Sequence, residues 1–174
     1  MIIAGKKKLG RSFFQNNTVE VAKNLLGKIL VFNDYQGIIT ETEAYRGEDD
    51  PASHAFKFTP RSRIMFGKAG ISYVYLIYGM YHCLNIVTET EGVPGAVLIR
   101  GIKQLKPHED LLDGPGKICR RLEINLNQNN IDLIDIPNFY VADAETISDF
   151  VAGPRIGIKK GLDKQWRFLL SSQF

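Results

Sequence analysis

The stretch ISYVYLIYGMYHCLNIV, residues 71–87, is the most apolar run of the sequence and decides how the fold is interpreted. It is shorter than the roughly 20 residues that a membrane-spanning helix needs, and it contains four tyrosines, His82, Asn85 and Gly79. β-Branched and aromatic residues at this density are typical of strands. The stretch therefore predicts two strands, joined by a turn at Gly79 and Met80.

The segments around this stretch predict further hairpins and short helices. Residues 28–32 and 36–45 form a predicted strand pair across the turn signal Asn33-Asp34, and 94–102 is another short strand. Asn17 is placed to cap a helix, with Glu20 three residues later as in a capping box. Residues 113–124 indicate an amphipathic helix, and 153–170 a loop with a final strand. No regular βαβ alternation is present, so we expect an α+β fold.

More specifically, we expect a single compact domain over residues 1–174. Its sheet would be curved and mainly antiparallel, with flanking helices and a protruding β-hairpin. The chain has 174 residues, of which 44% are hydrophobic and 24% charged, which is typical of one soluble globular domain and excludes disordered, collagen-like and coiled-coil chains. Only two cysteines occur, without a CxxC pattern, so we expect neither a disulfide framework nor a metal site.

Charge and the N-terminal sequence give weaker information about location and partners. The net charge of +3 permits a polyanionic partner without identifying one. Residues 1–14 lack the long apolar segment of a secretory signal, so we expect a cytoplasmic protein.

Two carboxylates on the predicted strand 36–45 are the first candidates for chemistry. Ile39, Glu41, Glu43 and Tyr45 alternate along the strand and are expected to share one face. Like charges at this spacing repel unless one meets a cation. Either the pair lies on a half-exposed strand edge, or one carboxylate is held ready to activate water beside the Tyr45 ring.

Tyrosines and cations are interleaved in the second half of the chain. Tyr73 and Tyr75 are expected to share a strand face, either within the core or as a platform on which nucleic-acid bases stack. Tyr78 belongs to the other face or to the turn, where a large side chain can wedge between base pairs. His54 stands without a second histidine nearby, as many surface histidines do. Cations that flank these elements are Arg61, Arg63, Arg100, Lys103, Lys106, Lys117, Arg120 and Arg121.

Five segments occur in an order that resembles one known family. TETEAYRGEDDPASHA, TPRSRIMFG, YVYLIYGMYHCLNIV, GAVLIR and GPGKICR are similar to motifs of the alkyladenine (3-methyladenine) DNA glycosylase family, in its mammalian-type class. The resemblance runs from about Gly27 to the region of Trp166, where Gln165 stands in place of an expected proline.

The resemblance implies a DNA repair enzyme that flips damaged purines out of duplex DNA and hydrolyses their N-glycosidic bond. The substrates would be alkylated and also deaminated purines, and the product an abasic site without strand cleavage by a lyase step. No cofactor and no metal are implied. The partner would be double-stranded DNA rather than a membrane, the enzyme would be a monomer, and it would work at the bacterial nucleoid or in a eukaryotic nucleus.

The resemblance also implies roles for individual residues. Glu43 would be the general base, and Arg100 would help to hold the attacking water. The walls of the base pocket would be Tyr45, His54 and Tyr75. Tyr78 would enter the duplex in place of the flipped base, and Asn85 would crowd the 2-amino group of a normal guanine. We expect the DNA backbone to contact a common surface formed by Arg61, Arg63, Lys117, Arg120 and Arg121.

Two other hypotheses remain at this point. The tyrosines and cations alone also fit a non-catalytic domain that binds single-stranded nucleic acid. The carboxylate fits equally a glycosidase that acts on free nucleosides.

Overall fold

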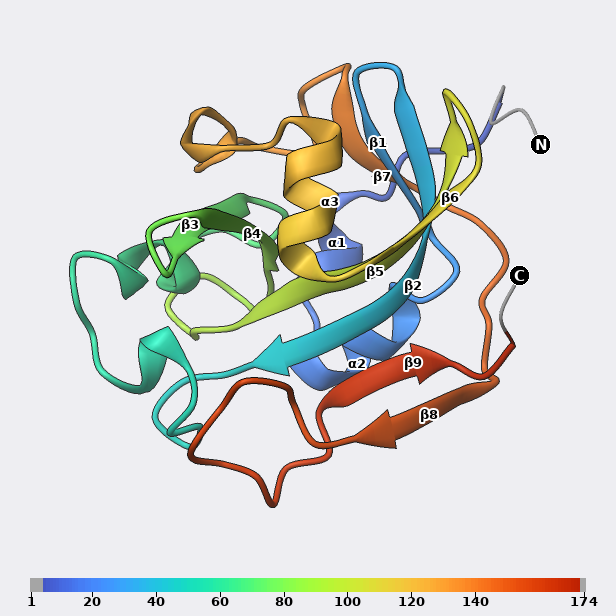
Figure 1. The fold of residues 1–174 in the computed structure, drawn as a ribbon. Coiled ribbons are helices and arrows are strands. Elements are labelled where there is room, and N and C mark those ends of the chain that lie inside the picture. Colours follow the sequence, from blue (N-terminus) through green and yellow to red (C-terminus); the bar gives the residue numbers. More distant parts are fainter. Residues whose placement is uncertain (1–4, 173–174) are drawn as a thin grey trace.

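Nine strands of the chain form one antiparallel sheet in the computed structural model, which describes residues 5–172 (Figure 1). Residues 1–4 and 173–174, the ends of the predicted domain and the start of the N-terminal segment discussed above, lie outside the described residues. The strands are β1 (Ile29–Phe32), β2 (Tyr35–Tyr45), β3 (Ser72–Ile77), β4 (Tyr81–Val87), β5 (Ala96–Lys106), β6 (Asp110–Asp113), β7 (Phe139–Ala142), β8 (Phe150–Gly153) and β9 (Arg167–Leu170). The main path runs β3-β4-β5-β2-β1-β7, with β6 beside β5 and the β8–β9 pair beside β2. The predicted α+β fold with a mainly antiparallel sheet is confirmed.

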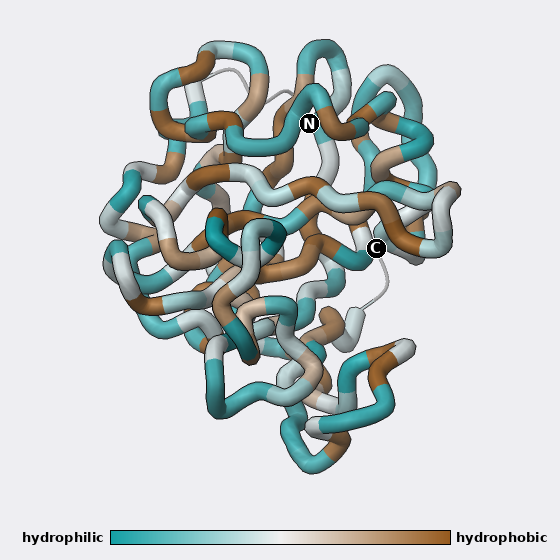
Figure 2. Tube along the Cα trace, turned by 90° about the vertical axis from the view of Figure 1, so that its left-hand side faces the viewer, coloured by the Kyte–Doolittle hydropathy of each residue, from teal (hydrophilic) through white to brown (hydrophobic). Residues whose placement is uncertain are grey.

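Short helices cover the central strands. They are α1 (Arg11–Phe14), α2 (Thr18–Asn24) and α3 (Pro115–Leu122), together with three 3₁₀ turns, η1 (His54–Phe56), η2 (Ser62–Phe66) and η3 (Leu126–Gln128). Helix α3 packs over β4 and β5, and α2 packs against β2 and β5 from the other side in Figure 1. The core between them is built from aliphatic and phenylalanine side chains such as Phe14, Leu25, Ile99 and Phe168. Figure 2 shows hydrophobic residues concentrated along the inner strands and hydrophilic residues along the outer loops.

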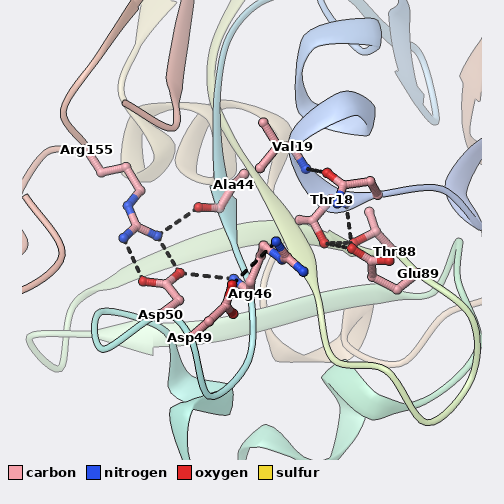
Figure 3. Close-up of polar contacts among 10 residues, drawn as sticks. Thr18, Val19, Ala44, Arg46, Asp49, Asp50, Thr88, Glu89 and Arg155 are labelled. Atoms are coloured by element: carbon pink, nitrogen blue, oxygen red, sulfur yellow. Dashed lines mark hydrogen bonds and ion pairs between the residues drawn. The ribbon is translucent and has the colours of Figure 1, made fainter. Parts of the chain in front are cut away.

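The predicted start of helix α2 is partly confirmed. The Asn17 side chain accepts a hydrogen bond from the Val19 N–H at 3.0 Å. The expected capping box is wrong, because Glu20 pairs with Lys23 at 2.8 Å. A distant carboxylate takes over at the helix start, since Glu89 accepts from the N–H of Thr18 at 2.7 Å (Figure 3). Tertiary structure thus supplies a cap that local sequence does not reveal.

Two of the three register shifts between β2 and β5 change the alternation that the sequence predicts. Ile39 pairs with Ile102 and Glu41 with Gly101, so Thr40 is an extra residue on β2. Ile39 consequently joins the hydrophobic core with Ala44, and its predicted place on the face of Glu41 and Glu43 is wrong. A bulge shifts the parity of a strand, which period-two reasoning cannot anticipate.

The second bulge lies on β5 and concerns a candidate residue. Gly101 pairs with Glu41 and Ile99 with Thr42, which leaves Arg100 as the extra residue. Gly101 itself has no room for a side chain, because a Cβ there would lie 2.8 Å from Thr40 Oγ1. Bulges re-aim side chains, and this one turns Arg100 out of the regular alternation of β5.

The stretch 71–87 forms the predicted hairpin, β3–β4. Its turn begins one residue earlier than expected, because Tyr78 and Gly79 both have positive φ, 52° and 68°. Tyr78 is the most exposed of the large hydrophobic residues at the hairpin tip, with 81% of its surface accessible. Both cysteines are buried free thiols. Within residues 5–172, no helix has the length and apolar character needed to cross a bilayer.

Candidate active site

A cavity of about 700 Å³ opens where β2, β3, β4 and β5 meet the start of α3. Its walls also include residues 156–158, which precede β9 in the chain. A volume of this size is typical of sites for small molecules. The residues of the sequence analysis that line it are Glu43, Tyr45, His54, Tyr73, Tyr75, Tyr78, Asn85, Arg100, Lys117 and Arg120.

Glu43 is completely buried at the inner end of this cavity. Its Oε2 accepts a hydrogen bond from the Tyr45 hydroxyl at 2.6 Å, and its Oε1 accepts one from the backbone N–H of Ile156 at 2.7 Å. Arg100 Nε lies 3.6 Å from the same Oε1. Burial raises the pKa of the Glu43 carboxyl above its ordinary value, although these three donors each lower it. Each oxygen keeps a lone pair for a further hydrogen bond.

Glu41 is buried as well, so the interpretation of the pair as surface charges is wrong. Its Oε1 accepts from Arg100 Nε at 3.2 Å and from Arg167 Nε, on β9, at 2.5 Å. Two carboxylates and two guanidinium groups therefore balance each other in charge. Arg100 Nε lies near one oxygen of each carboxylate, and its hydrogen bond to Glu41 helps to fix the Arg100 side chain on the cavity wall.

Aromatic rings form the adjoining wall. The His54 and Tyr75 ring centroids lie 4.6 Å apart, and those of Tyr73 and Tyr75 lie 5.3 Å apart, which confirms that the two tyrosines share a face. His54 Nδ1 is 2.8 Å from the Tyr73 hydroxyl. Burial and the charge of Arg61 lower the pKa of His54 to about 4, so the ring is neutral near pH 7. Burial raises the pKa values of Tyr45 and Tyr75 above the ordinary value, so both keep their hydroxyl protons.

Two further candidates, one buried and one exposed, also line the cavity. Asn85 is buried on β4, and its amide donates to the Tyr73 carbonyl at 3.1 Å. This bond fixes the orientation of the Asn85 side chain. Tyr78 stands at the rim, and its left-handed backbone conformation turns it away from the strand alternation.

The five cationic residues that were expected to contact the DNA backbone lie at three places on the protein. Lys117 and Arg120, on α3, line the cavity. Arg61 and Arg63 line a second groove that shares Tyr73 and Tyr75 with the cavity, and the Arg61 guanidinium lies 5.0 Å from the Tyr75 ring centroid. The remaining cation, Arg121, forms an ion pair with Asp110 at 2.6 Å.

Sequence reasoning missed the backbone N–H of Ile156 and the paired role of Glu41. No local pattern marks Ile156, because its contact with Glu43 joins segments 113 residues apart. Tyr73 was predicted either as a core residue or as a stacking residue, but not as the partner of His54. Among the residues that the structure describes, no group of three or more His, Cys, Asp or Glu side chains is arranged to hold a metal ion.

The chain is similar to known proteins over most of its length. A family described as methylpurine-DNA glycosylase matches residues 12–173. A protein of Sodalis glossinidius that carries the name 3-methyladenine DNA glycosylase is 59% identical over 161 residues, covering 92% of this chain and 95% of its own. Proteins of the same name from Ehrlichia ruminantium (strain Welgevonden) and a Wolbachia of Brugia malayi are 53% and 54% identical, covering 93% and 92% of this chain and 88% and 95% of their own. A match of this extent establishes kinship, and the chain belongs to the methylpurine-DNA glycosylase family.

Proposed function

We propose that this chain removes damaged purines, alkylated and also deaminated, from double-stranded DNA by hydrolysing their N-glycosidic bond. The observation that carries the proposal is Glu43, a fully buried carboxylate at the end of a cavity walled by aromatic rings. The 3-methyladenine name of its relatives supports the same substrate class.

In this proposal Glu43 is the general base. A water molecule placed between the carboxylate and C1′ of the flipped nucleotide loses a proton to Glu43 as its oxygen bonds to C1′. The C1′–N bond breaks, and its electron pair leaves with the base. Burial raises the pKa of Glu43, which makes it a stronger base, while its hydrogen bonds and Arg100 each lower the pKa and offset part of that rise. The buried negative charge also stabilises an oxocarbenium-like transition state.

The pocket selects the base through stacking and charge. Tyr45, Tyr75 and neutral His54 offer π-faces, and a purine that carries a positive charge after alkylation gains about 0.5–2 kcal/mol from a cation–π contact. Such a base is also a better leaving group, because it departs as a neutral molecule. Asn85, which lines the cavity, would crowd the 2-amino group of guanine but not the ring of hypoxanthine.

Extrusion of the base from the duplex is required before this chemistry, and it costs about a few kcal/mol. Tyr78, exposed at the tip of the β3–β4 turn and on the rim of the cavity, is positioned to fill the gap that the base leaves. Lys117 and Arg120 on one side and Arg61 and Arg63 on the other would contact the phosphates.

The proposal includes hydrolysis without strand cleavage, by a monomer. Lys117, on the cavity wall, has its Nζ bound to Asp113 at 2.5 Å, and this engagement of the amine supports a reaction without a lysine nucleophile. A borohydride trapping experiment should yield no covalent complex with DNA.

The test is incubation of the purified protein with duplexes that contain a single 3-methyladenine or hypoxanthine. We expect release of the free base, with strand breaks only after alkali treatment. Undamaged duplex is the control. Intact lesions after prolonged incubation would refute the proposal.

The two other hypotheses make different predictions in the same assay. A single-strand-binding domain would bind single strands at least as tightly as lesion duplex and release no base. A nucleoside hydrolase would cleave free nucleosides but not DNA. The exposed Tyr78 at the cavity rim favours the duplex substrate, because a free nucleoside leaves no gap to fill.

A further inference from the structure

We propose that Arg155, held by Asp50, is a positioning residue that fixes both hydrogen-bond donors of Glu43. This inference rests on the proposed role of Glu43 as the general base. It concerns residues behind the cavity wall that are not among those lining it.

Arg155 and Asp50 form a fully buried, two-pronged ion pair (Figure 3). The distances are 2.6 Å from Nη1 to Oδ2 and 2.7 Å from Nη2 to Oδ1, and both side chains have no accessible surface. Arg155 Nε is buried and makes no hydrogen bond with any residue that the structure describes. Burying two charges is expensive, and such a pair stabilises a fold little more than apolar packing would. Its value lies in fixing a geometry.

The first donor that Arg155 fixes is the Tyr45 hydroxyl. The guanidinium carbon lies 4.6 Å from the centroid of the Tyr45 ring, and Nη1 donates to the carbonyl of Ala44 at 2.8 Å. Ala44 stands between Glu43 and Tyr45 in the chain. One guanidinium thus holds both the ring of Tyr45 and the backbone from which Glu43 and Tyr45 extend.

The second donor is the backbone N–H of Ile156, the residue that follows Arg155. Ile156 is 47% exposed. Pro154, which precedes Arg155, and Gly157, which follows Ile156, are exposed as well. Arg155 is therefore the buried anchor of this segment. Without it, the Ile156 N–H has no packed side chain to hold it 2.7 Å from Glu43.

Asp50 extends the arrangement to the loop that carries His54. Its carboxylate accepts from the N–H of Arg46 at 3.0 Å and from the N–H of Ala52 at 3.2 Å. Gly161 closes over the pair, because a Cβ there would lie 3.0 Å from Arg155 Nη2. The ion pair therefore joins three segments that meet behind Glu43, from 44–46, 50–52 and 155–161.

The test compares Arg155→Lys with Arg11→Lys. Arg11 is a matched control, since it binds Asp132 at 2.7 Å and the Ala69 carbonyl at 2.7 Å, away from the cavity. Lysine keeps the charge but cannot bridge both carboxylate oxygens and a carbonyl, and it lacks the planar face that lies on Tyr45. The readout is the pH dependence of single-turnover excision on a lesion duplex.

The expected result is a shift of the acid limb to higher pH in Arg155→Lys only. Both donors lower the pKa of Glu43, so loosening them raises it, and the carboxylate is then ionised only at higher pH. We expect about one pH unit, which is about a tenfold loss of rate at a pH on the limb. The other ionisable groups that face Glu43 are not among the groups that Arg155 holds: Arg100 on β5, Glu41 on β2 and Cys83 on β4.

A second measurement does not depend on activity. Hydrogen exchange of the Ile156 amide should be faster in Arg155→Lys than in the wild type, and unchanged in Arg11→Lys. If Arg155→Lys does not fold, the double variant Arg155→Gln, Asp50→Asn removes both charges together and leaves no buried charge unpaired.

The outcomes separate the inference from the proposed function. A wild-type protein that releases no base refutes the proposed function itself. An active wild type, with the acid limb and the Ile156 exchange rate unmoved in the folded Arg155 variant, overturns the inference. Equal shifts in the Arg11 control also overturn it, because the effect would then reflect general loosening.

Discussion

Replacing Glu43 by glutamine should abolish most base excision while leaving the fold intact. Glutamine has the same shape, its oxygen can still accept from the Ile156 N–H, and its amide can donate to a reversed Tyr45 hydroxyl. Arg100 keeps Glu41 at 3.2 Å as a charged partner. The thermal unfolding midpoint should therefore stay within a few degrees of the wild type, about the effect of 1 kcal/mol or less.

The expected loss of rate follows from the missing proton acceptor. A positioned general base contributes about 10²–10⁴-fold, which corresponds to about 2.7–5.4 kcal/mol of barrier. The assay is single-turnover excision from a hypoxanthine duplex, scored by alkali-induced strand breaks, together with a gel-shift measurement of binding. Binding to lesion DNA should persist.

Glu41→Gln is the matched comparison, since it removes the same charge two residues away on the same strand. It loosens Arg100 and Arg167 but leaves the base in place, so its loss of rate should be smaller. A folded Glu43→Gln variant that excises at the wild-type rate would show that Glu43 takes no part in the reaction. So would a larger loss from Glu41→Gln than from Glu43→Gln.

Three further predictions concern the hairpin, the histidine and the cations. Tyr78→Ala should leave stability unchanged, because the side chain is 81% exposed, but should slow excision from paired lesions more than from lesions in single strands, as compared in parallel assays. The pKa of His54 is about 4 in the folded protein and 6.5 in the unfolded chain. Between these values the unfolded chain binds more protons, so stability should fall as the pH drops from 6.5 to 4. Urea unfolding should show a shallower pH dependence in His54→Asn. Removing the charge of Lys117 or of Arg120 should weaken binding to all duplexes alike. Each substitution should reduce the slope of the logarithm of the DNA-binding constant against the logarithm of the salt concentration by about one, as measured by fluorescence titration. An unchanged slope would show that the residue contacts no phosphate.

Local patterns predicted most of the sheet. The hairpin of residues 71–87, the pair 28–32 and 36–45, and the strand 94–102 all appear, because alternation and turn residues act over a few positions. Strands β6, β7 and β8 were not predicted, since each has only four residues, and β7 also depends on β1, which lies far away in the chain. The bulges at Thr40 and Arg100 also escaped prediction, because they arise from the fit between β2 and β5.

The candidate site likewise combines residues that local motifs predicted with contacts that depend on distant segments. Short ordered motifs indicated Glu43, Tyr45, His54, Tyr75, Asn85 and Arg100, and the structure brings all of them to one cavity. The contacts that tune Glu43 could not be predicted, because a backbone N–H carries no sequence signature and the Arg155–Asp50 pair joins residues 105 positions apart.

The sequence by itself determined the type of most of the secondary structure, the family and the identity of the candidate reactive groups, since these depend on residue type and on spacing within a strand or turn. Only the tertiary structure decided the state of those groups. It buried Glu41 and Glu43, supplied two arginines to balance their charge, and set two donors on Glu43. Burial and hydrogen bonding control a pKa, and both are created where distant segments pack against each other.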